Sequence, residues 1–196
     1  MKDYSLRKTE YKRVFALPDE FACEIGHIAS RWSTIEETVK RTVYMVAPVP
    51  SPVGRIAIGT ARQSEQLKKV QYLLYYHHLA IPPDLAKLQA QLSDLQPLRD
   101  KYVHAVWLGD DKGNIFIVDL SGKLDLGKNA PPLTKRMFPE ALPVTVNDLK
   151  QLVVSLDAAG VGLATLHDQI RDLHVRTLMR KVRAEIDADF PNLDQT

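Results

Sequence analysis

The chain has 196 residues, a length typical of one domain with appended segments. Hydrophobic residues make up 45% and charged residues 26% of it, which is ordinary for a soluble globular protein, and the net charge of +2 excludes partner choice by bulk charge alone. Cys23 is the single cysteine, which excludes an internal disulfide, and we expect it in the core. The polar N-terminus and the lack of about 18 consecutive apolar residues predict neither a secretion signal nor a membrane span. The composition therefore indicates a cytoplasmic protein.

Two amphipathic helices are predicted in the first part of the chain. Apolar residues spaced three and four apart from Phe21 to Val43 predict a helix over 20–44, with Asp19 as its N-terminal cap. The proline-rich run 48–54 cannot sustain the helical hydrogen bonds and ends it. A second helix is expected over about 61–79 from the same spacing.

After the third predicted helix, the spacing of the apolar residues changes from helical to strand-like. This helix starts at Pro83 and continues with leucines at three-and-four spacing, and Pro97 is expected to kink it or to split it in two. Residues 106–108 and 115–118 then read as two short strands joined by a turn-rich loop. The polar stretch 121–143 either extends this hairpin or crosses the surface.

The last predicted helix has the clearest start. Thr145 and Asp148 approximate a capping box, and an apolar stripe runs from Leu149 to Leu173. Its end, 171–183, holds five basic residues against one acidic residue, and an acidic tail follows over 184–196. Four such helices predict a mainly α protein, an antiparallel helical bundle in a single domain over 1–196, with a β-hairpin and loop insertion at about 106–143.

The segment 99–104 carries the residues best suited to chemistry. Arg99 lies on the apolar line of its helix, and because a guanidinium cannot shed its charge it needs acceptors close by. Asp100 and His104 are one helical turn apart, so the carboxylate can orient the imidazole. An imidazole so placed suits proton transfer near neutral pH.

This segment resembles the signature of HEPN domains: an arginine, a polar residue that is usually asparagine, three further residues and a histidine. Here the motif reads Arg99-Asp100-Lys101-Tyr102-Val103-His104, so aspartate stands where asparagine is usual. Trp107 and the stretch 32–36 also resemble one bacterial branch of the family. The similarity covers roughly 20–107 and, more loosely, the final helix.

The resemblance implies a homodimer in which two signature helices face one another and form a metal-independent endoribonuclease site. His104 would transfer protons, Arg99 would hold the phosphate, and Asp100 would orient His104. Glu36, Tyr102 and Trp107 would support the site, and basic residues of the last helix would bind RNA, namely Arg171, Arg176, Arg180 and Lys181. The family setting is a bacterial toxin–antitoxin or defence system, with an antitoxin or another protein as partner.

A structural interpretation stands beside this one. Arg99 can instead pair with Glu36, which would make the chain a non-catalytic, homodimeric interaction module with Arg99 and His104 in structural roles. For the basic run 171–183 a solvated helix end is the favoured interpretation, because charge runs are usually solvated. We expect no metal or organic cofactor, because no ligand spacing stands out.

Two further histidine-containing segments also have structural interpretations. Tyr72, Tyr75 and Tyr76, followed by His77 and His78, favour a packed aromatic edge over a stacking platform or a metal site. His167 and His174 share a helix face, and a solvated face is the favoured interpretation.

Overall fold

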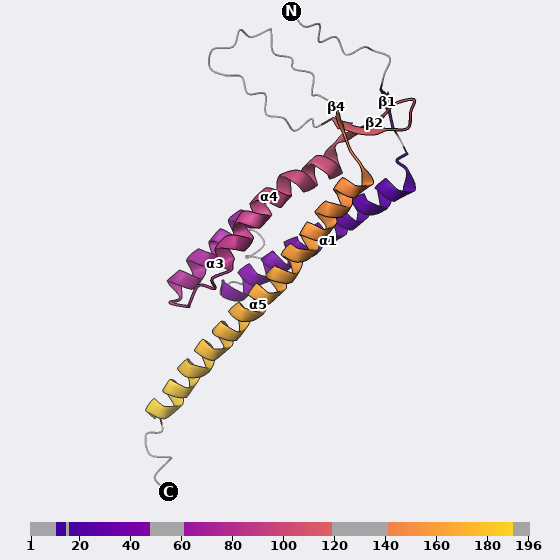
Figure 1. The fold of residues 1–196 in the computed structure, drawn as a ribbon. Coiled ribbons are helices and arrows are strands. Elements are labelled where there is room, and N and C mark those ends of the chain that lie inside the picture. The colour runs from indigo at the N-terminus through magenta and orange to yellow at the C-terminus, as the bar shows by residue number, and fades with distance from the viewer. Residues whose placement is uncertain (1–10, 15, 48–60, 119–140, 190–196) are drawn as a thin grey trace, which may run out of the picture. The chain divides into compact units, whose positions relative to one another are not determined.

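The computed structural model describes residues 11–14, 16–47, 61–118 and 141–189, with side chains as far as Arg183. In this part of the chain lie the helices α1 (Asp19–Val46), α3 (Gln63–Tyr76), α4 (Leu85–His104) and α5 (Val146–Asp189), which Figure 1 labels. The prediction of a mainly helical chain is confirmed. The proline-rich run 48–54, most of the stretch 121–143 and the end of the acidic tail lie outside the described residues, whereas 184–189 belong to α5.

The chain forms two compact units. The first unit comprises Met1–Trp32 and Leu95–Leu156, and the second comprises Ser33–Asp94 and Asp157–Thr196. Helices α1, α4 and α5 each contribute a segment to both units.

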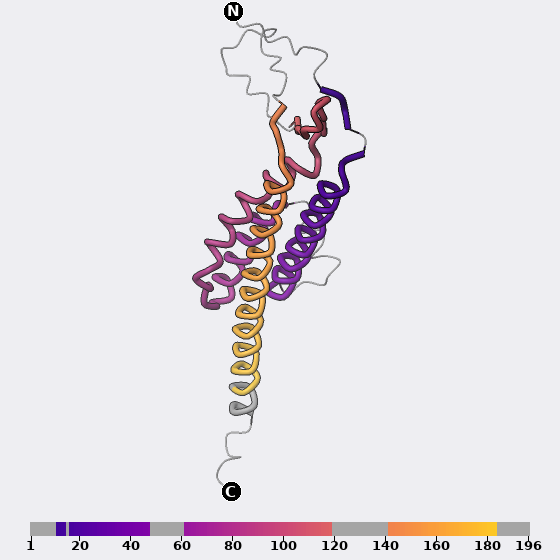
Figure 2. The backbone as a smooth tube through the Cα atoms, turned by 45° about the vertical axis from the view of Figure 1, so that its right-hand side comes forward, coloured from indigo at the N-terminus to yellow at the C-terminus, as the bar shows by residue number. Residues whose placement is uncertain are grey.

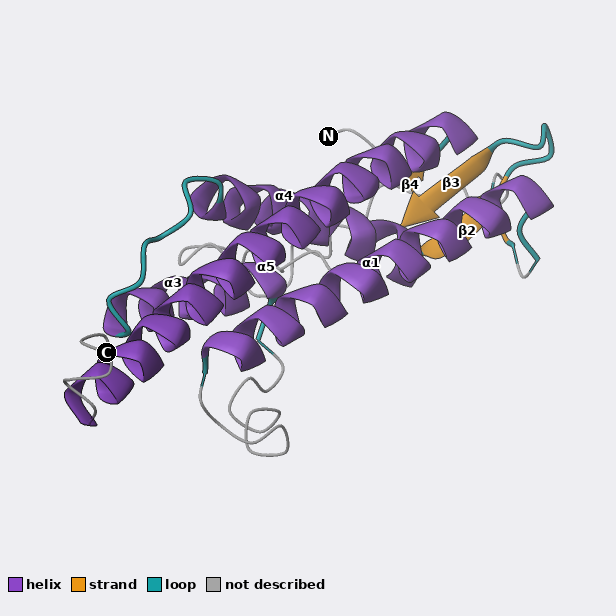
Figure 3. Cartoon of the chain, turned by 90° about the horizontal axis from the view of Figure 1, so that it is seen from below, coloured by secondary structure: helices purple, strands orange, loops and turns teal. Residues whose placement is uncertain are grey.

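An antiparallel sheet belongs to the first unit. Its strands are β1 (Lys12–Arg13), β2 (Val106–Gly109), β3 (Ile115–Val118) and β4 (Ala141–Pro143), in that order. Figure 3 labels β2, β3 and β4. Strands β2 and β3 are the predicted hairpin, with Trp107 opposite Ile117. The edge strands β1 and β4 widen it beyond the expected two strands, and β4 realises the alternative in which the end of 121–143 extends the hairpin.

The turn between β2 and β3 is held by one carboxylate. Asp110 accepts hydrogen bonds from the backbone N–H groups of Lys112 and Asn114, at 2.9 and 2.8 Å, and from the Asn114 side chain at 2.7 Å. These bonds lower the pKa of Asp110, with the Asn114 side chain contributing most. Gly113 supplies the positive φ of +82° that the turn requires.

The start of α5 confirms the predicted capping box. The Asp148 carboxylate accepts from the backbone N–H and the hydroxyl of Thr145, both at 2.7 Å, and the Thr145 hydroxyl oxygen accepts from the Asp148 N–H at 3.3 Å. These bonds, led by that from the hydroxyl, lower the pKa of Asp148. The capping box therefore fixes the start of α5, directly after β4.

Helix α4 is continuous through Pro97, so the predicted split into two helices is wrong. Proline removes one N–H from the helical ladder, but the leucines of the preceding turns, Leu88, Leu92 and Leu95, are buried, and their packing outweighs one lost hydrogen bond. The signature segment therefore lies on the last turns of a single long helix.

Apolar residues from the three shared helices and from β3 fill the core of the first unit. Its buried residues include Phe21, Ile28, Trp32, Leu95, Ile117, Leu149, Leu152 and Leu156. The three-and-four spacing of those on the helices is the sequence pattern that predicted these helices.

The core of the second unit contains a buried polar contact. Thr42 is 1% exposed and donates its hydroxyl to the Thr38 carbonyl at 2.8 Å, so the 3.0 Å contact with His167 Nδ1 requires the ring to donate. His167 is therefore half-buried and hydrogen-bonded, and its assignment to a solvated face is wrong.

Burial along α5 ends at Ile170. Beyond it, Val175, Leu178, Met179 and Val182 are exposed, and Figure 2 shows this end of the helix running on past its neighbours in the second unit. The stretch Val146–Arg183 is long and apolar enough to cross a membrane, with 39% of its most apolar window buried. Core helices of soluble proteins meet the same criterion, so this is weak evidence for a span.

Candidate functional site

Arg99 occupies the centre of the predicted site, on the inner side of the last turns of α4. Its guanidinium carbon lies 5.9 Å from the centroid of the Trp32 ring, which is 1% exposed. The Arg99 side chain keeps 22% of its surface exposed. This cation–π contact holds the guanidinium near a buried indole while part of the side chain stays open to solvent.

The hydrogens of Arg99 can be assigned one by one. Nη1 donates to Asp100 Oδ1 at 2.8 Å and to His104 Nε2 at 3.2 Å, which uses both of its hydrogens. Nε is buried without a partner in the described part of the chain. Nη2 has no hydrogen-bond partner among the described residues and is not buried, so two N–H groups remain for an external acceptor.

The Arg99 contact defines the state of the histidine. A guanidinium only donates, so His104 Nε2 must offer its lone pair, and the ring is neutral with its proton on Nδ1. His104 is exposed at the end of α4. A neutral, accessible imidazole beside a guanidinium can take a proton from an acidic or activated hydroxyl.

Asp100 has a different role from the one its spacing predicts. Its carboxylate accepts from Arg99 and not from His104, so the expectation that Asp100 orients the imidazole is wrong. The side chain next along the helix reaches the guanidinium, and the stronger charge-assisted bond forms there. Arg99 is the residue that positions His104.

The three predicted supporting residues are not brought together. Tyr102 is half-buried, and its pKa is raised first by burial and second by the nearby Asp148 carboxylate. Trp107 belongs to β2 and packs edge-to-face on Phe21, with ring centroids 6.1 Å apart. Glu36 belongs to the second unit.

Glu36 has its own partner in that unit. Gln63 Nε2 donates to Glu36 Oε1 at 2.9 Å. Each member of the Arg99–Glu36 pair that the sequence allowed therefore interacts with a residue of its own unit.

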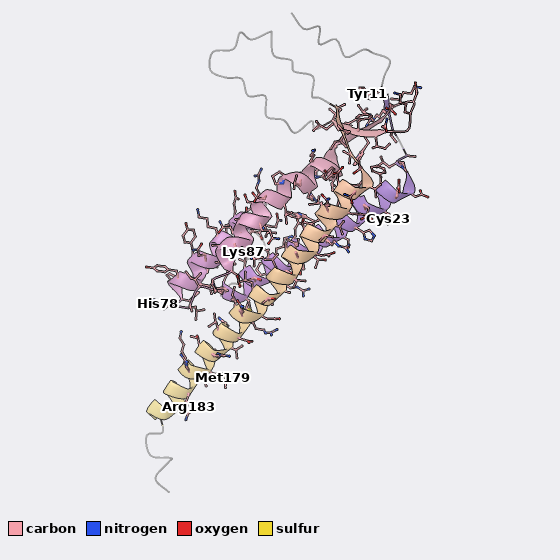
Figure 4. The ribbon with its side chains drawn as sticks, in the orientation of Figure 1. Tyr11, Cys23, His78, Lys87, Met179 and Arg183 are labelled. Atoms are coloured by element: carbon pink, nitrogen blue, oxygen red, sulfur yellow. The ribbon has the colours of Figure 1, made fainter. Side chains whose placement is uncertain are left out.

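The basic residues predicted to meet RNA are all exposed on α5. Arg171 lies 3.0 Å from Asp168 and 3.7 Å from Asp172, so local carboxylates offset its charge. Arg176, Arg180 and Lys181 have no ion-pair partner among the described residues. Figure 4 shows Met179 and Arg183 on this free end of the helix.

Sequence reasoning missed a Cys–His–Arg line on α1. Cys23 is exposed rather than buried, which corrects its assignment to the core, and its Sγ lies 3.3 Å from His27 Nε2. Arg31 donates to His27 Nδ1 at 3.2 Å, so the neutral ring carries its proton on Nε2 and donates toward the sulfur. The lone pair of the His27 ring therefore faces Arg31, so the ring cannot accept a proton from the Cys23 thiol. The i, i+4 spacing of these residues was the signal that could have revealed the line.

The tyrosines of α3 are also placed differently from expectation. Tyr72 is 61% exposed, and Tyr75 and Tyr76 are each 75% exposed, so the predicted packed aromatic edge is wrong. The buried face of α3 is formed by Leu67, Val70 and Leu74, about half a turn away.

No group of three or more histidine, cysteine, aspartate or glutamate side chains within the described residues could hold a metal ion. No protein-family model matches the chain, and neither the curated proteins nor the solved structures include a match to it.

Proposed function

We propose that this chain is a HEPN-like, metal-independent endoribonuclease that works as a homodimer, with an antitoxin or another protein as its regulatory partner. The observation that carries the proposal is the 3.2 Å contact between Arg99 Nη1 and the exposed His104, with Nη2 left open beside it. A cation and a neutral imidazole in contact supply the phosphate binding and the proton transfer that RNA cleavage needs.

The contact suggests how substrate activates the base. Arg99 holds the Nε2 lone pair of His104 in the free protein. A phosphodiester that draws the guanidinium toward its oxygens weakens this bond and releases Nε2. The imidazole then accepts the ribose 2′-hydroxyl proton, and the 2′-oxygen attacks phosphorus. The bond from phosphorus to the 5′-oxygen breaks as that oxygen takes a proton from the protonated His104 of the second copy in the homodimer. The products are a 2′,3′-cyclic phosphate end and a 5′-hydroxyl end.

The test is a matched pair of histidine variants assayed on single-stranded RNA. His104→Ala should lower the cleavage rate by about 100-fold or more, the usual effect of losing a proton-transfer group. His27→Ala is the control, because His27 is also exposed and also accepts from an arginine at 3.2 Å. Equal rates for both variants, or products without a cyclic phosphate, would refute the ribonuclease.

A second candidate function follows from the Arg99–Asp100 ion pair at 2.8 Å. The pair neutralises the guanidinium and, with Trp32 beneath it, would fix the end of α4 in a non-catalytic interaction module. In that case Arg99→Ala lowers the unfolding free energy, while no RNA is cleaved at any concentration of the parent protein.

A further inference from the structure

An aromatic surface at the C-terminal end of α3 has no role in the proposed cleavage. Tyr72, Leu73, Tyr75, Tyr76 and His78 line an open hollow of about 570 Å³. Exposed tyrosines are unusual in such number, since the apolar body of the ring is normally buried. Three of them within five residues on the outer face of one helix indicate a surface that binds something.

The rings differ in how much of their faces is available. Lys68 Nζ lies 5.9 Å above the Tyr72 ring, and Tyr76 makes an edge contact with His77 at 5.2 Å between centroids. Tyr75 makes no ring contact among the described residues and is 75% exposed. Tyr75 is therefore the ring best placed to stack on an external π-system.

His78 is held against this surface by an unusual cap. Its N–H donates to the Tyr75 carbonyl at 3.0 Å, and the Leu79 N–H donates to the Leu74 carbonyl at 2.9 Å, the two bonds of a Schellman motif. The left-handed position of this motif normally holds glycine or asparagine, but here His78 adopts it with φ of +55°. A fourth aromatic ring is thus kept in a strained backbone position at the rim of the hollow, which Figure 4 labels at the end of α3.

The charged residues beside the tyrosines of α3 indicate which class of ligand this surface binds. Lys68 and Lys69 lie one turn before the tyrosines on the same outer face of α3, against the single acid Glu65. Lysines next to a row of exposed aromatic rings suit a single-stranded nucleic acid. Its phosphates are attracted to the lysines, and its unstacked bases can stack on the rings. In a double helix the bases are paired and stacked on one another, so their faces are not accessible to such a surface.

We propose that the surface formed by Tyr72, Tyr75, Tyr76 and His78 binds single-stranded RNA by stacking unpaired bases, with Lys68 near the backbone phosphates. This inference shares its RNA ligand with the proposed function, but it concerns binding and does not depend on cleavage. Stacking of this kind would select unpaired segments of RNA. Unpaired RNA is also flexible enough for a 2′-hydroxyl to line up with its neighbouring phosphate.

The test measures binding of a fluorescent 12-nucleotide single-stranded RNA to the full chain carrying His104→Ala, so that cleavage cannot interfere. Tyr75→Ala should weaken binding by about 5- to 150-fold, the range for one lost stacking contact, whereas Tyr75→Phe should stay close to the parent. His78→Gly suits the left-handed cap, so it should keep the fold while also weakening binding. The duplex of the same sequence should bind less tightly than the single strand.

Several outcomes would overturn the inference. They are alanine variants that bind within twofold of the parent, a phenylalanine variant as weak as the alanine variant, equal binding of duplex and single strand, or tyrosine variants that change only the oligomeric state. The last would assign the surface to a second copy of the chain. The two proposals fail separately, because loss of cleavage in His104→Ala is read in one assay and loss of binding in Tyr75→Ala in another.

Discussion

Asp100 takes one of the two Nη1 hydrogens of Arg99 and brings a negative charge to the place where a phosphate would bind. Asp100→Asn keeps an oxygen that can accept from Arg99 but removes this charge. We expect RNA to bind about two- to fivefold more tightly, which corresponds to the modest energy of a partly exposed charge pair. Titration of a labelled RNA at fixed salt checks this.

The control for this prediction is Asp94→Asn, which removes the same charge from an exposed position on the same helix. It should change RNA affinity by less than Asp100→Asn. If both variants gain equally, the effect is one of net charge and Asp100 has no local role at the site. If Asp100→Asn binds more weakly, the carboxylate positions Arg99 for the phosphate.

The pairings within the site could be predicted only in part. The sequence pattern correctly placed Arg99 and His104 in the last turns of one helix, although residues five apart lie about 140° from one another around the helix axis. Spacing could not show that Asp100 would turn to Arg99, since adjacent side chains diverge on an ideal helix and only the long, flexible arginine closes the gap. Trp32, far away in sequence, becomes part of the site only through folding.

At the level of elements, the helices could be predicted and the edge strands could not. The long apolar stripes of α1 and α5 span many turns, so their period is unambiguous. Strands β1 and β4 are two and three residues long, too short for alternation to appear, and pairing with the hairpin creates them. The exposed face of α3 was misassigned because tyrosine fits a core as well as a binding surface.

Two glycines in α5 provide a test of helix packing that does not depend on function. A Cβ at residue 160 meets nothing within 4 Å, so Gly160→Ala should raise the unfolding free energy by about 0.5–1 kcal/mol through helix propensity and reduced entropy of the unfolded chain. A Cβ at residue 162 would lie 2.8 Å from the Leu88 side chain, which is 5% exposed. Overpacking there costs about 1–3 kcal/mol, so Gly162→Ala should be neutral or destabilising.

Urea unfolding of the two variants, with an unchanged slope, gives the comparison. Gly160→Ala should unfold at a higher urea concentration than the parent protein, and Gly162→Ala at a lower concentration than Gly160→Ala. Equal gains in both variants would mean that Leu88 moves aside without cost and that α5 does not pack closely on α4 at Gly162.

At the scale of the whole molecule, the groups that RNA cleavage needs indicate how many copies of the chain act together. One reaction needs a base for the 2′-hydroxyl and an acid for the leaving oxygen, and one imidazole cannot fill both roles in a single step. In the free protein, one Arg99 offers only the two N–H groups of Nη2, whereas both non-bridging oxygens of the phosphate gain charge during cleavage. Two copies related by a twofold axis would supply a second guanidinium and a second imidazole, which would act as the acid in its protonated form.

A mixing experiment tests this requirement. Wild-type chain and His104→Ala chain, combined at equal amounts and allowed to exchange, should give about one quarter of the wild-type activity, because only dimers with two intact copies retain both imidazoles. Activity per chain should also fall on dilution as dimers dissociate, with light scattering reporting the mass at each concentration. If activity instead follows the wild-type fraction in a straight line and does not change on dilution, each protomer cleaves alone. A group other than a second His104 must then protonate the leaving oxygen.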